Sequence, residues 1–302
     1  MKDINVQANN KINLVGKLLD VEFGQGTLSD NRPYERATVT VRVTQTYEGK
    51  TETSEVPVSI FATQYTSTGK ANPAFKNIQD LKTMKTAQNV GIDNADTVRM
   101  TGLSLQENNF VSRTGVLING WQIRGSFINV VKAPEVASFE IQIYVMSMTD
   151  EVDRDGELTG RMILKGGIVQ YGGKLDVVEF IVDDPDKIDY IQRNWGENKT
   201  VTVRGRIRVT SEEVTSAGNS SWGEDIPEEQ TTKFVRELII LTGDDVPVDD
   251  EFGYNPVEIK KAFNDRKARI EQLQINARQK ATKQGAMDAN KAGTSNKSYD
   301  WE

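Results

Sequence analysis

The stretch KTVTVRGRIRV, residues 199–209, alternates apolar and polar side chains and carries a glycine near its middle. A similar stretch, DTVRMTGLSL, occupies residues 96–105. Alternation with a period of two is typical of a β-strand with one buried and one exposed face. A glycine inside such a strand indicates a bulge or a bend. We therefore expect two strands that bend sharply, at Gly102 and Gly205.

Further alternating runs surround the first of these strands. They cover residues 12–23, 35–47, 54–63 and 137–148. Between the third and fourth runs, Asn72 and Pro73 precede apolar residues at helical spacing, which predicts a helix. The expected order is three strands, one helix and two strands.

The same order recurs around the second glycine-containing strand. Strands are expected at residues 160–171, 174–182, 199–209 and 233–243, with a helix at 184–195, and one strand of the set is missing from this pattern. The two copies are offset by roughly 110 residues, too far for a solenoid repeat. A helix between the third and fourth strands of a five-stranded Greek-key barrel is the OB-fold arrangement. We predict a mainly β protein with two tandem OB-fold domains, a C-terminal helix and a flexible tail.

The charge distribution supports a division into three regions, residues 1–149, 150–247 and 248–302. Of the 302 residues, 37 are Lys or Arg and 44 are Asp or Glu, which gives a net charge of −7. The first region holds 15 basic and 14 acidic residues, whereas the second holds 12 and 21. Because the second region carries the deficit, the first can present a basic face locally.

Composition excludes several classes of protein. The chain has no Cys and no His, which removes disulfides, thiol nucleophiles, imidazole bases and nearly all zinc sites. No apolar run reaches about 18 residues, and the N-terminal sequence lacks a hydrophobic signal core. We expect a cytoplasmic protein with no membrane segment.

Two acidic clusters, VDDPDKID and GDDVPVDDEF, raise the alternative of a metal-dependent nuclease, because paired carboxylates can hold Mg²⁺. The first cluster opens a helix, where acidic residues complement the helix dipole, and the second lies in a proline-containing linker. No phosphate-binding P-loop is present in the sequence. We expect a binding protein without cofactor or metal, not an enzyme.

The stretch NKINLVGKLLD, residues 10–20, is followed by the predicted helix and by the pattern V-x-M-x-G-x-x-L. Together they resemble bacterial and phage single-stranded DNA-binding proteins of the OB-fold type, here as a phage-type variant with two OB domains. The resemblance implies sequence-independent binding of single-stranded DNA (ssDNA) in replication or recombination, in a bacterial or phage-infected cytoplasm. In that family, ssDNA wraps over strand faces and along the hairpin that joins the last two strands, and its bases stack on aromatic residues between basic ones.

The first region contains residue types suited to this chemistry. In the second predicted strand, one face is apolar, so Arg36 and Arg42 lie on the other. Phe61 alternates outward on the third strand, near Tyr65 and Lys70. Bases stack on aromatic rings and phosphates need nearby cations. Phe61 could instead pack against the neighbouring domain.

A hairpin is expected between the fourth and fifth strands. Asn119-Gly120 is a strong signal for its two-residue turn, next to Trp121. The alternatives here are that Trp121 caps the barrel, and that the loop with Arg32 and Tyr34 is an ordinary turn. The predicted ssDNA-binding residues are Lys17, Arg32, Tyr34, Arg36, Arg42, Phe61, Tyr65, Lys70, Arg113, Trp121 and Arg124.

Arg204, Arg206 and Arg208 alternate along the second glycine-containing strand. Their spacing suits a phosphate track, but the region around them is acidic. An ion-paired or solvated face is therefore the favoured interpretation.

The last region begins with a helix signal, in which Asn255 can cap, Pro256 suits the first helical position and Glu258 completes a capping box. Apolar residues then form a stripe through about residue 280 that either docks on a barrel or pairs subunits in a homo-oligomer. A polar tether is expected afterwards. Its tip, Tyr299, Asp300, Trp301 and Glu302, is expected to bind replication or recombination proteins. The alternative function is an OB-fold protein–protein scaffold of a replication or virion assembly without direct DNA binding.

Overall fold

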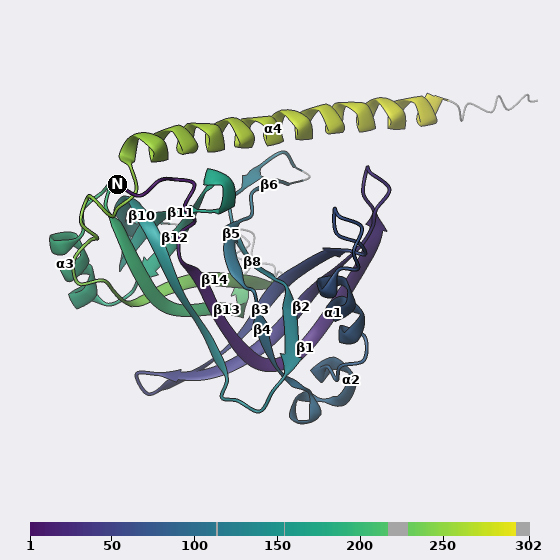
Figure 1. The fold of residues 1–302 in the computed structure, drawn as a ribbon, viewed down its shortest axis with the longest axis horizontal. Helices are drawn as coiled ribbons and strands as arrows, with labels where there is room; N and C mark the ends of the chain where they lie inside the picture. The colour runs from purple at the N-terminus through teal and green to yellow at the C-terminus, as the bar shows by residue number, and fades with distance from the viewer. Residues whose placement is uncertain (113, 154, 217–228, 294–302) are drawn as a thin grey trace, which may run out of the picture.

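Strands dominate the computed structural model, which describes residues 1–112, 114–153, 155–216 and 229–293 (Figure 1). The strands are β1 (Asn10–Thr27), β2 (Pro33–Tyr47), β3 (Lys50–Thr63), β4 (Thr97–Thr101), β5 (Ser104–Glu107), β6 (Phe110–Val111), β7 (Leu117–Ile118), β8 (Trp121–Gly125), β9 (Phe127–Val130), β10 (Val136–Val152), β11 (Leu158–Val169), β12 (Leu175–Val182), β13 (Thr200–Ser216) and β14 (Glu229–Gly243). The helices are α1 (Pro73–Leu81), α2 (Ala87–Val90), α3 (Pro185–Asn194), α4 (Pro256–Gly293) and the short 3₁₀ helices η1 (Ile92–Asn94) and η2 (Tyr171–Gly173).

The first barrel closes through a ring of paired strands. β1 pairs with β2, and β2 pairs with β3. β3 runs parallel to β8, β8 pairs with β5, and β4 pairs with both β9 and β1. β4 and β5 are two halves of one bent strand, as are β8 and β9. With α1 between the third and fourth strands, this ring is an OB-fold barrel.

The second barrel repeats this pairing. β10 pairs with β11 and β13, β11 with β12, and β13 with β14, while β12 runs parallel to β14. α3 again separates the third strand from the fourth. The predicted fold class, a mainly β protein with two tandem OB-fold domains followed by a C-terminal helix, is therefore confirmed.

β10 has a different place from the one expected for residues 137–148. The sequence pattern made it the fifth strand of the first region, but it is the first strand of the second ring. The fifth strand of the first barrel is formed by β8 and β9. The sequence pattern did not reveal it, because apolar and polar residues alternate over only a short stretch there. This also accounts for the strand that seemed to be missing from the second copy. We propose a domain boundary near residue 135 in place of the expected 149.

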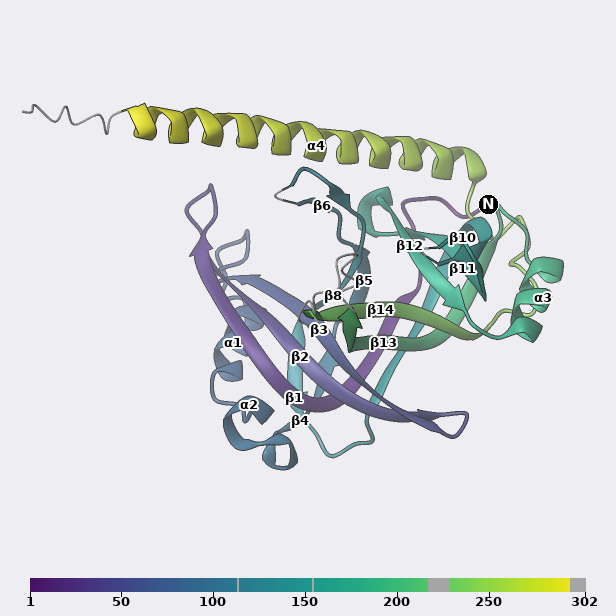
Figure 2. The same cartoon turned by 180° about the vertical axis from the view of Figure 1, so that it is seen from behind.

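The two barrels share one continuous sheet. β1 pairs antiparallel with β10, so that Asn10 lies opposite Ile141 and Val15 lies opposite Val136. The far end of the β2–β3 hairpin reaches the second barrel, where the Val209 backbone N–H donates to Ser54 Oγ at 3.3 Å. Seen from behind, α1 and α2 lie on the side of the first barrel that faces away from the second (Figure 2).

The two glycines that prompted the fold prediction lie at bends. Gly102 separates β4 from β5 and has φ of 64°, a left-handed conformation that favours glycine. At Gly205 the register of β13 against β14 shifts, and an added Cβ would lie 1.9 Å from the Ile239 carbonyl oxygen. The prediction of two bent strands is confirmed.

α4 begins at the predicted position. Asn255 Oδ1 accepts a hydrogen bond from the Val257 backbone N–H at 3.0 Å, and Glu258 accepts from the Ile4 N–H instead of closing a capping box. Ile259 is buried, whereas Leu273 and Ile275 are more than two-fifths exposed. The first turns therefore dock on the protein, and the helix then extends past β6 (Figure 1).

The expected end of α4 near residue 280 was wrong, because the backbone is helical to Gly293. The added residues include Ala, Lys, Gln and Met, which favour helices, and no proline interrupts them. The predicted tip, Tyr299, Asp300, Trp301 and Glu302, lies outside the described residues. Across the described ranges, none of the helices combines the length and the apolar character that crossing a membrane requires.

Candidate nucleic-acid interface

The outer face of β2 and β3 is the candidate site, and alternation along the two strands builds it. Their inward residues form the barrel core: Ala37, Val39, Val41 and Val43 on β2, and Val56, Val58, Ile60 and Ala62 on β3, all buried. The residues between them therefore point outward. We call these the β2–β3 face: Tyr34, Arg36, Thr38, Thr40 and Arg42 of β2, Pro57, Ser59 and Phe61 of β3, and Arg124 of the adjoining β8.

Two glycines on β1 make room for the largest side chains of this face. Gly24 lies opposite Arg36, and Gly26 lies opposite Tyr34. A Cβ at either glycine would come within 2.6 Å of the side chain across from it. Because β1 presents no side chain there, Arg36 and Tyr34 can lie over the strand.

An aromatic pair marks one end of the face. Phe61 lies opposite Arg36 and is the diagonal neighbour of Tyr34. The rings of Phe61 and Tyr34 therefore meet, with centroids 5.0 Å apart and planes tilted by 35°. Phe61 is 53% exposed although it lies on a barrel strand. A phenylalanine that remains half exposed does not serve the core, and it offers a surface on which a base can stack. The described structure thus does not bury Phe61 against the second barrel.

Three arginines line the rest of the face. Arg36 and Arg124 are exposed, and Arg42 is half-buried. Within the described part of the chain, none of the three forms an ion pair or a side-chain hydrogen bond. The rows between them are filled by uncharged Thr38 and Ser59, and Ser59 lies directly opposite Arg124. These guanidinium groups are free to bind phosphate.

Acidic residues border this face at β1 and at the far end of β3. Asp20 and Glu22 lie opposite Thr40 and Thr38, and Glu55 lies opposite Arg42. The positive charge is therefore concentrated over Arg36 and Arg124, next to the aromatic pair.

The loops next to the aromatic pair hold further predicted residues. Arg32 forms an ion pair with Asp30 at 2.7 Å, and this arginine holds the pKa of Asp30 below its ordinary value. Tyr65 is 45% exposed and lies in the loop that follows β3, as does the exposed Lys70. Both are placed next to the end of β3 that carries Phe61, as the sequence predicted, whereas the ion pair supports an ordinary turn for Arg32.

Two of the predicted ssDNA-binding residues make contacts within the protein instead. Lys17 Nζ donates to the Ala95 carbonyl at 2.9 Å. Trp121 is only 8% exposed, and the guanidinium of Arg236 stacks on its ring at 4.5 Å. The expectation that Trp121 offers an open stacking surface was wrong, because its side chain is buried and Arg236 covers its ring. Arg113 lies outside the described residues.

The hairpin turn was also misplaced. The hairpin between the fourth and fifth barrel strands consists of β6 and β7, and the Ser112 N–H donates to the Val116 carbonyl across its end. Asn119 and Gly120 lie at its base, where the Asn108 N–H donates to the Gly120 carbonyl. A two-residue hairpin turn of this type needs positive φ, and neither residue has it.

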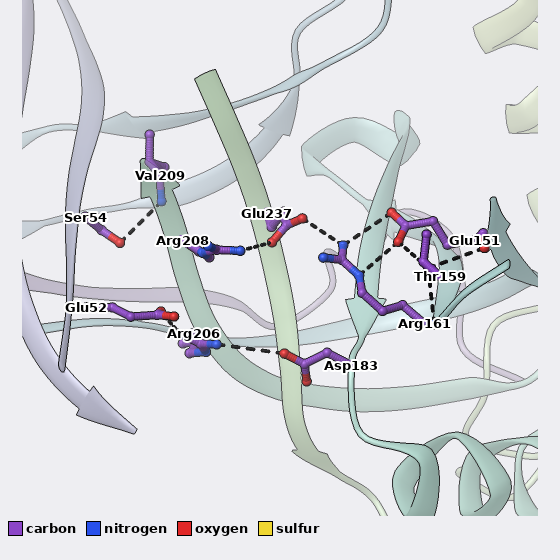
Figure 3. Close-up of polar contacts among 10 residues, drawn as sticks. All are labelled: Glu52, Ser54, Glu151, Thr159, Arg161, Asp183, Arg206, Arg208, Val209 and Glu237. Atoms are coloured by element: carbon purple, nitrogen blue, oxygen red, sulfur yellow. Dashed lines mark hydrogen bonds and ion pairs between the residues drawn. The ribbon is translucent and has the colours of Figure 1, made fainter. Parts of the chain in front are cut away.

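The arginines of β13 are ion-paired, as the sequence favoured. Arg204 contacts Glu140 at 3.0 Å. Arg208 contacts Glu237 at 3.2 Å, and Arg206 contacts Glu52 and Asp183 (Figure 3). Because these contacts engage carboxylates from both barrels, the stripe holds the protein together instead of presenting free cations.

The first acidic cluster has a structural role at a helix start. Asp184 Oδ1 accepts a hydrogen bond from the Asp186 N–H at 3.0 Å, and its carboxylate pairs with Lys187 at 2.9 Å. The Lys187 ammonium lowers the pKa of Asp184. This carboxylate therefore caps α3.

Sequence reasoning missed Gly24, Gly26 and Arg236. The two glycines were visible, but their importance depends on the register between β1 and β2. Arg236 lies on β14 of the second barrel yet reaches Trp121 of the first, a contact across 115 residues that no local pattern signals.

Comparison with solved structures returned crystal structures of the single-stranded DNA-binding protein from Thermus aquaticus. A deletion mutant matches with a TM-score of 0.49 and 11% sequence identity, covering 83% of this chain and 98% of that one. The wild-type protein matches with a TM-score of 0.47 and 10% identity, covering 79% and 93%. Among curated proteins, none matches this sequence. The YorF family model matches residues 8–276, which is most of the chain, and the protein therefore belongs to the YorF family.

Proposed function

We propose that this protein binds single-stranded DNA without sequence preference, through the β2–β3 face, and acts in DNA replication or recombination. It works as a binding protein in the cytoplasm of a bacterium or of a phage-infected cell, without catalysis and without a cofactor. The site consists of Tyr34, Phe61 and Tyr65 as stacking residues and Arg36, Arg42, Lys70 and Arg124 as phosphate contacts.

The observation that carries this proposal is the Tyr34–Phe61 pair, with Phe61 53% exposed, on the same face as a row of unpaired guanidinium groups, one of which, Arg36, lies opposite Phe61. Bases in a single strand can unstack from each other and stack on an aromatic ring, whatever their identity. Phosphates on either side then meet guanidinium groups that form no ion pair within the described residues. Bases in a duplex are already stacked, so the same face binds duplex DNA weakly.

Titration of fluorescein-labelled oligo(dT) and of a duplex of equal length, each at two salt concentrations, tests the proposal. We expect far tighter binding of oligo(dT). If about four phosphates are neutralised, log K falls against log salt with a slope of roughly −3. Equal affinity for the two DNAs would contradict stacking on this face.

The C-terminal region extends the proposal to partners. α4 exposes Leu273 and Ile275 beyond the turns that dock on the barrel, which supports pairing of two copies through this helix. We also propose that the tip, Tyr299, Asp300, Trp301 and Glu302, binds replication or recombination proteins, because its sequence sets two aromatic residues beside two carboxylates after a polar stretch.

A protein-binding scaffold is the second candidate function. It is favoured by the second barrel, whose outward arginines are held by carboxylates (Figure 3). Failure of oligo(dT) binding in the titration above, with an intact fold, would favour it.

A further inference from the structure

A groove of about 1660 Å³ lies on the second barrel, beneath α4 and beside the β6–β7 hairpin. Residues from β10, β11, β12 and β14 line it, and the first barrel contributes the hairpin and Trp121. The groove is therefore formed by parts of both barrels and the C-terminal helix.

The groove is the second barrel's counterpart of the β2–β3 face. β11 and β12 follow β10 just as β2 and β3 follow β1, and they pair in the same way. Their outward residues line the groove: Arg161, Ile163 and Lys165 on β11, and Val177, Glu179 and Ile181 on β12.

The charges in this groove differ from those on the β2–β3 face. Arg161 contacts Glu151 at 2.9 Å and Glu237 at 2.7 Å, and Glu237 also holds Arg208 (Figure 3). Lys165 pairs with Glu179 at 3.2 Å, and Arg266 of α4 pairs with Glu107 at 2.6 Å. These cations are neutralised by the protein itself, so the groove offers little attraction to a polyphosphate chain.

Arg236 differs from the other four cations of the lining. Its guanidinium stacks on Trp121 and donates to the Trp121 carbonyl at 3.2 Å, but no carboxylate of the described residues pairs with it. Arg236 keeps part of its surface exposed, and burial of the rest lowers its pKa, because protein replaces some of the water around the charge. A carboxylate brought to this partly desolvated cation gains a strong, charge-assisted hydrogen bond.

Apolar side chains open into the same groove. Phe110 is 49% exposed, Ile118 is 40% exposed and Phe234 is 74% exposed. Phe110 and Ile118 come from the β6–β7 hairpin, and Phe234 comes from β14, two residues before Arg236. Exposed apolar residues around a hollow are typical of a binding surface.

We propose that this groove binds an extended segment of a partner protein that presents an apolar or aromatic side chain next to a carboxylate. The apolar side chain packs between Phe110, Ile118 and Phe234, and the carboxylate pairs with Arg236. The neutral charge of the lining excludes nucleic acid from the groove and admits a peptide. This proposal stands independently of DNA binding by the first barrel.

Selection of a random peptide display library on the full-length protein tests the proposal. We expect enriched peptides to combine an aromatic or large aliphatic residue with an adjacent Asp or Glu. A labelled synthetic copy of the enriched sequence is then titrated against variants. Arg236→Gln and Phe234→Ala weaken its binding about tenfold or more. The matched controls, Arg193→Gln on α3 and Phe252→Ala, are exposed residues outside the groove and leave it unchanged.

Several outcomes would overturn the proposal. Enriched peptides without a carboxylate, or peptides whose binding ignores both groove variants, would exclude it. If Arg236→Gln lowered the affinity for oligo(dT), the groove would instead be part of the DNA-binding surface. If Arg236→Gln alters the thermal melt, Phe234→Ala decides the result, because that side chain is 74% exposed and its removal leaves the core intact.

Discussion

Arg36 lies between Gly24 on one side and Phe61 on the other, so a cation and a ring share one row across three strands. At the scale of single residues, this row differs from the arginine row of β13 because its charges have no partner in the described protein. The arginines of β13 have similar spacing, but carboxylates hold them. The two surfaces differ less in how many basic residues they hold than in whether those residues are free to bind a ligand.

The aromatic pair gives the first prediction. Phe61→Ala and Tyr34→Ala each lower the free energy of oligo(dT) binding by about 1 to 3 kcal/mol, because each removes a stacking surface. Phe252→Ala serves as the control, since Phe252 is 66% exposed but lies in the segment before α4. Fluorescence anisotropy titration measures the effect. Identical affinities for the Phe61 and Phe252 variants would remove the aromatic pair from the site.

The arginines give the second prediction. Arg42→Ala weakens oligo(dT) binding more than Arg204→Ala does, because Arg42 is free and Arg204 is paired with Glu140. The same titration at low salt measures both. The reverse order would show that the second barrel is the main DNA-binding surface.

The pair formed by Arg204 and Glu140 also gives a pH prediction. Hydrogen bonds from Arg204 and then Asn9 hold the pKa of Glu140 below its ordinary value of 4.5. A lowered pKa in the folded state stabilises the protein above pH 4.5, and this contribution disappears as the pH falls through the lowered value. Since both side chains are more than a third exposed, it amounts to about 0 to 1 kcal/mol.

Urea unfolding of the wild type and of Glu140→Gln measures this contribution. At pH 7 the variant should be less stable, and the two free energies of unfolding should converge once the pH has fallen below the lowered pKa of Glu140. A difference that stays constant between these pH values would show that Glu140 stabilises the fold by other means than its charge.

At the scale of elements, bent strands close the barrels, and one glycine of β13 has no room for a side chain. A Cβ at Gly205 would lie 1.9 Å from the Ile239 carbonyl oxygen and 2.5 Å from Phe139 Cζ. Gly205→Ala should therefore destabilise the protein by about 2 to 4 kcal/mol, through overpacking and a disturbed strand pair.

Thermal and urea unfolding measure that loss. Gly120→Ala is the matched control, because Gly120 has no positive φ and its nearest neighbour would be 3.5 Å from the new Cβ. A Gly205 variant as stable as the control would mean that β13 does not need its bend.

The sequence predicted elements well and their partners less well. Asn72 and Pro73 predicted α1, and the alternation of apolar and polar residues predicted β2 and β3. These predictions succeeded because both signals are local in the sequence. Residues 137–148 were recognised as a strand but placed in the wrong barrel, since pairing with β11 and β13 is decided by tertiary packing. Trp121 failed for the same reason: its burial depends on Arg236, which is 115 residues away.

At the scale of the whole molecule, two barrels with the same strand pairing have equivalent faces that differ. β1 and β10 join them into one sheet, and Arg206 of β13 contacts Glu52 of β3 to hold the hairpin of the first barrel against the second. The β2–β3 face keeps free arginines and one exposed aromatic ring, that of Phe61. The corresponding face of the second barrel is lined by ion pairs and lies beneath α4. We infer a division of labour, with DNA on one barrel and protein on the other.

The most direct test of this division is ultraviolet cross-linking of the full-length protein to oligo(dT), followed by mass spectrometry of the linked peptides. Thymine cross-links to the aromatic residues on which it stacks, so the account predicts links at Tyr34, Phe61 and Tyr65, and their loss at high salt. Links confined to Phe110 and Phe234 would contradict it, because they would place the DNA in the groove of the second barrel.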